Sequence, residues 1–406
     1  MATLHPFRAL RPAPAAAPAV AAVPYDVINA DEARTLAAGK PLSFLHISRA
    51  ELGLPASTDP YSDVVYDSAK QNFDRLKSAA PLVVDDAPSV YFYRLRMGSH
   101  VQTGLAACYS LDEYDGDVIL KHEKTRKDKE DDRTRHMLEL GAQTGPVFLT
   151  YTAAPEIDAL AASATAGAPL YDFTAEDGVQ HTIWRVSGDT AGALVAAMGR
   201  VPRLYIADGH HRAASASRTR AELRRRGESR PEADTFLAVA FPHDQVQILA
   251  YNRLVKDLGS HQRPGELIEA VGKTHQLTPG PAVPARQGEV SMFVAGHWLT
   301  VPLKRSSGHS PSDSLDVSLL HDQILAPCLG IGDERTDKRI DFVGGGRGTS
   351  ALEYAVGSGK AAVAFSLAPV SVQDLMAISD AGEIMPPKST WFEPKLLSGF
   401  FVHPLD

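Results

Sequence analysis

The chain has 406 residues, of which 44% are hydrophobic and 22% charged, a composition typical of globular proteins and a length that predicts two or three packed units. A net charge of −8 argues against a protein that coats nucleic acid, and two widely spaced cysteines argue against a disulfide framework. No run approaches the roughly 18 apolar residues of a membrane span, and prolines interrupt the Ala-rich N-terminal stretch. We therefore expect a cytoplasmic protein without a nucleic-acid or membrane partner.

Apolar periodicity and turn residues divide the chain into short elements. Short apolar runs bounded by turn residues predict strands, and they lie at 44–47, 90–93, 147–151, 182–186, 203–207, 236–241, 247–251 and 361–367. The strands at 236–241 and 247–251 are expected to pair with each other, and a hairpin is expected near 292–301. Amphipathic or charged runs predict helices, and they lie at 66–76, 121–139, 212–226 and 317–325.

Strands and helices that do not alternate strictly predict an α+β fold. We expect three parts: an N-terminal α/β unit over 1–115, a catalytic core over 116–260, and a C-terminal α/β unit over 261–406 that closes the site.

The most informative motif is the turn from an apolar strand into a helix at Asp208-Gly209-His210-His211-Arg212. The first N–H groups of a helix lack partners within the helix, so they favour an anion. Two imidazoles and a guanidinium add donors for phosphate oxygens, and the Asp208 carboxylate suits Mg²⁺. The alternative is that Asp208 only caps the helix and the histidines lie on the surface.

A second candidate motif is the charged segment that contains His122, Glu123 and Lys124. A carboxylate framed by an imidazole and lysines stays ionised, so Glu123 is a candidate base for a substrate hydroxyl, and Lys124 is a candidate phosphate ligand. A solvated helix start explains the same residues equally well.

A third candidate is the proline-rich tail, in which Lys388, Ser389 and Thr390 offer one cation and two hydroxyls for phosphate. The alternative is a structural clasp at the end of the chain, and both can be true. The cluster Gly344–Gly348 is expected to be a loop.

Together these motifs resemble a widespread bacterial and archaeal family of unknown function, of the DUF1015 type. The resemblance covers nearly the whole chain and rests on five motifs: Pro24-Tyr25-Asp26-Val27-Ile28, His122-Glu123-Lys124-Thr125, Asp208-Gly209-His210-His211-Arg212, Tyr251-Asn252-Arg253 and Met385-Pro386-Pro387-Lys388-Ser389-Thr390. The Asp208 turn is also similar to the phosphate-binding turn of the ParB/sulfiredoxin superfamily, which includes free-serine kinases. That similarity implies a ParB/sulfiredoxin-like core.

By this resemblance, the protein is expected to be a kinase that transfers a phosphoryl group to an amino-acid hydroxyl, most plausibly that of free L-serine. Glu123 would be the base, and Asp208 the acidic residue of the turn and a ligand of Mg²⁺. The residues of the turn from Gly209 to Arg212, with Lys124 and Lys388 to Thr390, would bind phosphate. The small-molecule substrate would contact His122, Tyr25, Asp26, Asn252 and Arg253.

The phosphoryl donor is expected to be a nucleotide or pyrophosphate. A ParB-like nucleotide-binding regulator and a phosphate-ester hydrolase are alternatives that use the same turn. The turn lacks the cysteine of sulfiredoxin, and the acidic chain shows no helix-turn-helix signature of a partition protein.

Overall fold

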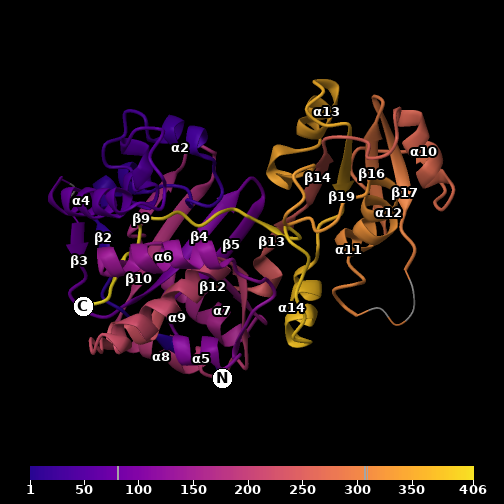
Figure 1. Ribbon diagram of the computed structural model, residues 1–406. Helices are drawn as coiled ribbons and strands as arrows, with labels where there is room; N and C mark the ends of the chain where they lie inside the picture. Colours follow the sequence, from indigo (N-terminus) through magenta and orange to yellow (C-terminus); the bar gives the residue numbers. More distant parts are fainter. Residues whose placement is uncertain (80–81, 306–307, 309) are drawn as a thin grey trace. The chain divides into compact units, whose positions relative to one another are not determined.

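The computed structural model describes residues 1–79, 82–305, 308 and 310–406 (Figure 1). The chain divides into two compact units, Met1–Val246 with Pro394–Asp406, and Gln247–Glu393. Each unit combines helices with a mainly antiparallel sheet, so the fold class is α+β, as predicted.

The first unit is built on a nine-stranded sheet in the order β6-β11-β8-β12-β5-β4-β10-β9, with β1 paired to β5. Its strands are β1 (Leu4–His5), β4 (Val90–Met97), β5 (His100–Ser110), β6 (Ile119–Leu120), β8 (Val147–Tyr151), β9 (Tyr171–Thr174), β10 (Gln180–Val186), β11 (Leu204–Asp208) and β12 (Thr235–Pro242). Only the pairs β6/β11 and β12/β8 are parallel among the described strands of this sheet. Because β4 and β5 pair with β10 and β12, the structure has no boundary near residue 115, where the sequence analysis placed one.

Helices and smaller elements complete the first unit. The helices are α1 (Ala17–Val20), α2 (Ala30–Ala37), α3 (Leu45–Ser48), α4 (Asp63–Ala79), α5 (Leu111–Asp115), α6 (Lys127–Leu140), α7 (Pro155–Ala164), α8 (Gly188–Met198) and α9 (His210–Arg225). The short strands β2 (Leu10–Pro12) and β3 (Leu82–Val84) pair, as do β7 (Ala142–Gln143) and β21 (His403–Pro404). The predicted strand at 44–47 is wrong: it forms α3, which buries Leu45 and Ile47, and so short an apolar run does not distinguish the two structures. The predicted charged helix starts only at Lys127, so His122 and Glu123 lie in the preceding loop.

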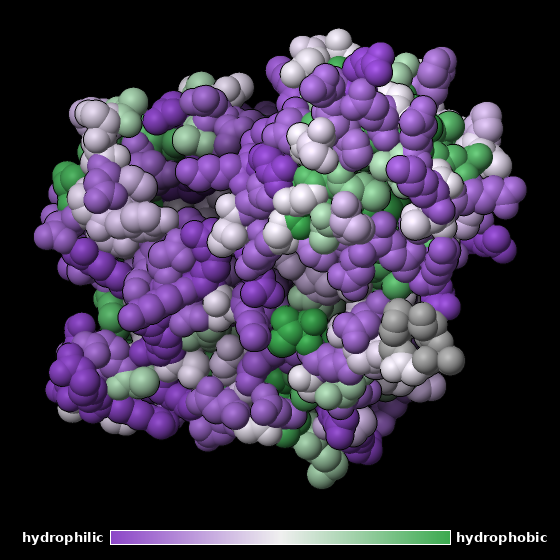
Figure 2. All heavy atoms as spheres, turned by 45° about the vertical axis from the view of Figure 1, so that its right-hand side comes forward, coloured by the Kyte–Doolittle hydropathy of each residue, from purple (hydrophilic) through white to green (hydrophobic). Residues whose placement is uncertain are grey.

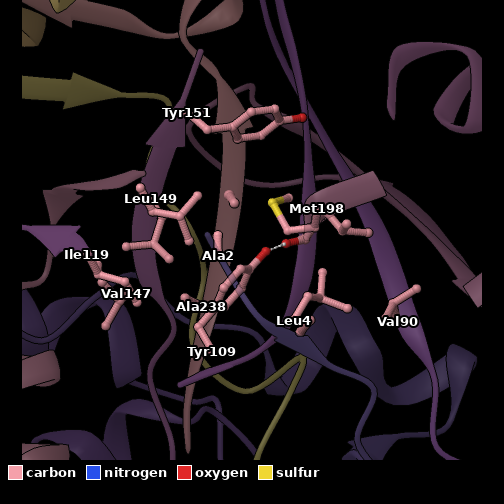
Figure 3. Close-up of a cluster of buried hydrophobic side chains, with 14 of the residues drawn as sticks. Ala2, Leu4, Val90, Tyr109, Ile119, Val147, Leu149, Tyr151, Met198 and Ala238 are labelled. Carbon is pink, nitrogen blue, oxygen red and sulfur yellow. Dashed lines mark hydrogen bonds between the residues drawn. The ribbon is translucent and has the colours of Figure 1, made fainter. Parts of the chain in front are cut away.

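The main hydrophobic core of the first unit packs helix and strand residues against the central sheet (Figure 3). Its labelled members include Leu4, Tyr109, Leu149 and Met198, all with at most 1% of their surface exposed. Tyr109 satisfies its buried hydroxyl by donating a hydrogen bond to the Leu105 carbonyl at 2.9 Å. This core fixes the central strands, and with them the sheet edge at which β6 and β11 end.

The second unit contains a six-stranded sheet in the order β15-β17-β16-β19-β14-β18 and a separate strand pair, β13-β20. The strands are β13 (Gln247–Leu249), β14 (Tyr251–Val255), β15 (Thr278–Pro279), β16 (Glu289–Val294), β17 (His297–Pro302), β18 (Ile340–Gly344), β19 (Val363–Leu367) and β20 (Trp391–Glu393). The helices are α10 (Pro264–Gly272), α11 (Asp316–Leu320), a π-helical turn (His321–Leu325), α12 (Ala326–Leu329), α13 (Ser350–Gly357) and α14 (Val372–Asp380).

Two sequence predictions for this part of the chain have opposite outcomes. The hairpin near 292–301 is confirmed by the pairing of β16 with β17. The predicted pairing of 236–241 with 247–251 is wrong, because β12 pairs with β5 and β8 while β13 pairs with β20. The unit boundary falls at Val246, upstream of the expected boundary at residue 260.

The last segment of the chain, Pro394–Asp406, belongs to the first unit. Ser398 and Ala22 exchange backbone hydrogen bonds of 2.8 and 3.0 Å. Phe400 and Phe401 pack against Tyr93, with ring centroids 5.7 and 6.4 Å away. These contacts hold the segment in place and thereby fix Lys395.

The surface view in Figure 2 shows a face on which hydrophilic residues predominate and hydrophobic ones form small separate groups. Among the described helices, none combines the length and apolar character needed to cross a bilayer.

Candidate functional site

The candidate site lies where the two parallel strands β6 and β11 end. Their register pairs Ile119 with Leu204 and Leu120 with Tyr205. Strands that run parallel end at the same edge of a sheet. The loop that follows β6 therefore brings His122 and Glu123 level with the turn that follows β11.

At the end of β11, Asp208 is held by two cations. The Lys395 Nζ atom lies 3.3 Å from Asp208 Oδ2, and the Arg212 Nη2 atom lies 3.6 Å from Asp208 Oδ1. Burial disfavours the ionised carboxylate, but Lys395 and then Arg212 outweigh burial and lower the pKa of Asp208 below its usual value. Asp208 is therefore ionised and forms ion pairs with both Lys395 and Arg212.

Arg212 is the central cation of the site, and its side chain is only 6% exposed. Its Nη2 atom also lies 3.7 Å from Asp26 Oδ2, and its Nη1 atom donates to the Pro146 carbonyl. Burial alone would lower the pKa of Arg212, but Asp26 and Asp208 raise it, so the guanidinium stays charged. These contacts hold a permanent positive charge within the first turn of α9.

Gly209 is the N-cap of α9, and its φ of +98° lies in the left-handed region that favours glycine. A Cβ atom there would lie 3.0 Å from Arg212 Cζ. We predict that Gly209→Ala lowers the free energy of unfolding by about 1–2 kcal/mol for the backbone conformation and also displaces the guanidinium, which weakens anion binding. Chemical denaturation measures the free energy of unfolding. The stabilisation of the fold by added phosphate measures anion binding.

Gly141→Ala is the matched control for this prediction. Gly141 has φ +61°, and a Cβ atom there would meet nothing within 4 Å. It should therefore lower stability to a similar extent while phosphate binding stays unchanged. Equal phosphate binding by both variants would contradict the role assigned to Gly209.

Next to the turn, His210 connects the two loops. Its Nε2 atom accepts a long hydrogen bond of 3.4 Å from the backbone N–H of His122, and its Nδ1 atom lies 4.0 Å from Glu123 Oε2. Burial, followed by the neighbouring His122, lowers the pKa of His210 well below its usual value. A neutral His210 that accepts at Nε2 carries its proton on Nδ1, on the side that faces Glu123.

His122 is a second buried imidazole, 1% exposed, and its ring meets that of His210 edge to face at a centroid distance of 4.4 Å. Neither ring nitrogen has a partner with hydrogen-bond geometry in the part of the chain that the structure describes. Burial lowers the pKa of His122 to about 4, although Asp208 and the Ile206 carbonyl favour the protonated ring. At neutral pH the site therefore contains two uncharged imidazoles beside the Glu123 carboxylate.

The N-terminal motif also reaches this site. Arg49 donates hydrogen bonds of 3.0 and 3.1 Å to the carbonyls of Tyr25 and Ile28, which fixes the loop that carries Asp26. The Arg133 guanidinium lies 4.4 Å from the centre of the Tyr25 ring. The structure thus brings Tyr25 and Asp26 to the Arg212 side of the site.

The remaining predicted residues of the first unit lie at its margin. His211 is partly buried, and its Nε2 atom accepts a hydrogen bond of 3.0 Å from the backbone N–H of Arg126. Lys124 is exposed in the loop between β6 and α6. A role in phosphate binding for these two side chains stays a prediction.

Five predicted site residues belong to the second unit: Asn252, Arg253, Lys388, Ser389 and Thr390. Asn252 Oδ1 accepts a hydrogen bond of 3.1 Å from the backbone N–H of Leu367, and Ser389 donates one of 2.7 Å to the Pro386 carbonyl. Their participation in the site of the first unit stays a prediction.

Lys395 is the one residue of this ion network that the sequence analysis missed. It follows the proline-rich tail closely, whereas the phosphate ligand that the sequence predicts in this tail is Lys388, which has two hydroxyl neighbours. The distinguishing signal is the aromatic pair at Phe400 and Phe401, which predicts that the end of the tail packs into a core.

The predicted Mg²⁺ ion at Asp208 can be compared with the groups around it. Mg²⁺ requires several oxygen ligands, and both oxygens of this single carboxylate already face Lys395 and Arg212. The described residues here do not fit a Mg²⁺ ion held by protein ligands alone. Arg212 and Lys395 supply the positive charge at this position instead.

These groups place a helix N-terminus, a buried guanidinium and a partly exposed carboxylate together at one sheet edge. The N-terminus of α9 and the Arg212 guanidinium are groups that can stabilise negative charge, and the Glu123 side chain beside them is 42% exposed. Such an arrangement is suited to the transfer or hydrolysis of a phosphoryl group.

Comparisons with known proteins give a family and several distant structural neighbours. No curated protein matches the sequence. Three similar structures are a free serine kinase mutant in complex with AMP (13% identity, 71% of this chain and 87% of that chain, TM-score 0.37), a conserved hypothetical protein from Pyrococcus furiosus (14%, 71% and 90%, 0.34) and C-terminally truncated SbnI from Staphylococcus aureus (10%, 72% and 85%, 0.36). Residues 4–318 match the family described as "Protein of unknown function (DUF1015)". The chain therefore belongs to the DUF1015 family, as its motifs predicted.

Proposed function

We propose that the protein is a phosphotransferase that moves a phosphoryl group from a nucleotide or pyrophosphate to the hydroxyl of a small amino acid, with free L-serine as the first acceptor to test. The observation that carries this proposal is the convergence of Glu123 and the first turn of α9 at one sheet edge, with Glu123 Oε2 only 4.0 Å from His210 Nδ1. A carboxylate base and an oxyanion seat are the two parts that phosphoryl transfer to a hydroxyl requires.

In the proposed reaction, Glu123 accepts the proton of the substrate hydroxyl. The hydroxyl oxygen then forms a bond to phosphorus, and the bond from phosphorus to the bridging oxygen of the donor breaks, with its electron pair leaving on the donor. The first amides of α9 and the Arg212 guanidinium hold the oxygens of the transferring group. Positioning and electrostatic stabilisation supply most of the rate in such reactions.

The choice of serine follows from the resemblance to free-serine kinases and not from a pocket in the structure. The side of the site near Asp26 and Tyr25 offers a carboxylate and a ring for the amino-acid part of the acceptor. A carboxylate there suits an ammonium group, which a free amino acid carries and a simple alcohol lacks.

The test is an assay of the full chain with L-serine, Mg²⁺ or Mn²⁺, and ATP, ADP or pyrophosphate in turn. We expect phosphoserine with one of these donors, detected by mass spectrometry. No phosphoserine with any donor would overturn the serine-kinase assignment. Nucleotide hydrolysis that serine does not alter would instead support the nucleotide-binding regulator or hydrolase.

Lys395→Met should weaken this activity while the fold is retained. Removal of the ammonium group 3.3 Å from Asp208 raises the pKa of that carboxylate towards its usual value and loosens the seat of Arg212. We expect a fall in kcat/KM of about 10–100-fold, which corresponds to the 1.5–3 kcal/mol typical of a charged hydrogen bond. Lys127→Met, at an exposed position of α6, is the control and should leave kcat/KM unchanged.

A further inference from the structure

We propose that His122, Glu123 and His210 bind a divalent transition-metal ion of the Zn²⁺ class. One ligand atom from each of the three residues can be chosen so that all three atoms lie within 4.8 Å of one another. Among the residues that the structure describes, this is the one such group of three His, Cys, Asp or Glu side chains. It is distinct from the single carboxylate Asp208, at which Mg²⁺ was expected.

The strongest support comes from His122. Its ring is buried, and among the described residues neither nitrogen has a partner with hydrogen-bond geometry. An unsatisfied buried polar group destabilises the fold, so folded proteins rarely retain one that has no partner or ligand. A metal ion bound to one nitrogen satisfies it, and a buried neutral imidazole is a common metal ligand.

The second imidazole, His210, faces the same space. It is 5% exposed, and its Nδ1 atom is turned towards Glu123 at 4.0 Å. Coordination through Nδ1 places the ring proton on Nε2, so the contact from the His122 amide must lengthen. That contact is already 3.4 Å long, at the outer limit of hydrogen bonding, and its loss therefore costs little.

The distances between the ligand atoms are close to those of a bound ion. Metal–ligand bonds of about 2.1 Å place two ligands at most about 4.2 Å apart. The 4.0 Å pair between Glu123 and His210 already meets this limit. The other pairs of ligand atoms are at most 4.8 Å apart, so they must approach one another slightly to bind an ion. Rotation of the partly exposed Glu123 side chain can bring its oxygen closer.

The ligand types select the ion. Two imidazoles and one carboxylate favour Zn²⁺, Co²⁺, Mn²⁺ or Fe²⁺, whereas Mg²⁺ and Ca²⁺ prefer oxygen ligands only. Three protein ligands are the number found in catalytic zinc sites, which keep a further position for water or substrate. Glu123 offsets one positive charge of the ion, so the occupied site would also attract an anionic substrate. Coordination through one carboxylate oxygen leaves the other to accept the proton of the substrate hydroxyl.

The experiment measures metal binding by the full chain, stripped with a chelator and without a polyhistidine tag. Zn²⁺ is titrated in competition with a chromophoric chelator, and Co²⁺ is titrated while its visible absorption is recorded. We expect one ion per chain. Glu123→Gln and His122→Ala should each weaken Zn²⁺ binding by about 100-fold or more, beyond the 10–100-fold typical of residues outside the coordination shell.

Two variants locate the ion. His211→Ala removes the adjacent histidine, and Asp208→Asn removes the neighbouring carboxylate; both should bind Zn²⁺ with nearly unchanged affinity. Failure to bind Zn²⁺, wild-type affinity in Glu123→Gln and His122→Ala, or an equal loss in His211→Ala would each overturn the proposal. Glu123→Gln changes a partly exposed side chain, so it tests the site even if His122→Ala does not fold.

Metal binding by the free protein is measured without nucleotide or serine. A failure to form phosphoserine therefore leaves the metal result intact, and an absence of metal leaves the kinase assay to be judged separately.

Discussion

Glu123→Gln is expected to lower kcat for phosphoryl transfer by about 10²–10⁴-fold, the usual contribution of a general base. Glutamine keeps the shape of the side chain but cannot accept the proton of the substrate hydroxyl. Because the Glu123 side chain is 42% exposed and lies in a loop, the free energy of unfolding should change little. Steady-state kinetics with the active donor, beside thermal unfolding, measure the two quantities.

Glu139→Gln is the matched control. Glu139 lies on α6 with a side chain that is 39% exposed, and its Oε1 atom forms a distant ion pair with Arg135 Nε at 3.9 Å. It should keep full activity. If Glu123→Gln retained the wild-type kcat, Glu123 would not be the base and the proposed mechanism would have to be abandoned.

Arg253→Met is expected to lower the stability of the second unit by about 3–5 kcal/mol, as is typical when one member of a buried ion pair is removed. Arg253 is fully buried and donates hydrogen bonds of 2.6, 2.8 and 3.2 Å to the carbonyls of Tyr251, Lys388 and Pro387. Its Nη2 atom also lies 3.3 Å from Glu334 Oε2. The substitution removes the cation beside the buried Glu334 carboxylate and leaves three carbonyls without this donor.

Hydrogen exchange of peptides from the second unit measures this effect locally. Arg263→Met is the control, because Arg263 is 82% exposed and pairs with Glu266 on the surface at 3.1 Å. Replacing Glu334 with leucine in the Arg253→Met background should recover part of the lost stability. Equal hydrogen-exchange protection in Arg253→Met and Arg263→Met would show that Arg253 does not hold the turn at Lys388.

The same contacts give a structural role to Arg253 in the motif Tyr251-Asn252-Arg253. Arg253 holds Pro387 and Lys388, and Lys388 has φ +56°, an uncommon backbone conformation for a residue with a side chain. Arg253 and Lys388, 135 positions apart, are thus in direct contact. This structural contact is a role for the Tyr251-Asn252-Arg253 and Lys388 motifs that requires no bound ligand. Direct contact of Arg253 with a substrate stays a prediction.

The candidate site could be predicted from sequence where its chemistry is local. The strand, the glycine and the helix around Asp208 follow one another, so propensity and turn chemistry are enough to place them. The proximity of Glu123 follows from the parallel pairing of β6 with β11, which local patterns do not reveal because β6 spans only Ile119–Leu120. The local charge pattern already made Glu123 a candidate base, and the resemblance to a known family implied that it acts together with the turn.

The wrong predictions share a physical cause, which is that tertiary contacts decide the outcome for short apolar runs. The segment at 44–47 is amphipathic as a helix as well as a strand, and its burial selects the helix. The runs at 236–241 and 247–251 look like a hairpin, but each finds a partner far away in the sequence. The ParB/sulfiredoxin-like character of the core stays a prediction.

The return of Pro394–Asp406 to the first unit has a consequence for biosynthesis. The ribosome makes Lys395, Phe400 and Phe401 only after the whole second unit, so the first unit cannot complete its aromatic cluster or neutralise Asp208 while the chain is nascent. A chain that stops before residue 394 would lack the Lys395 partner of Asp208 and the Phe400 and Phe401 rings that pack on Tyr93.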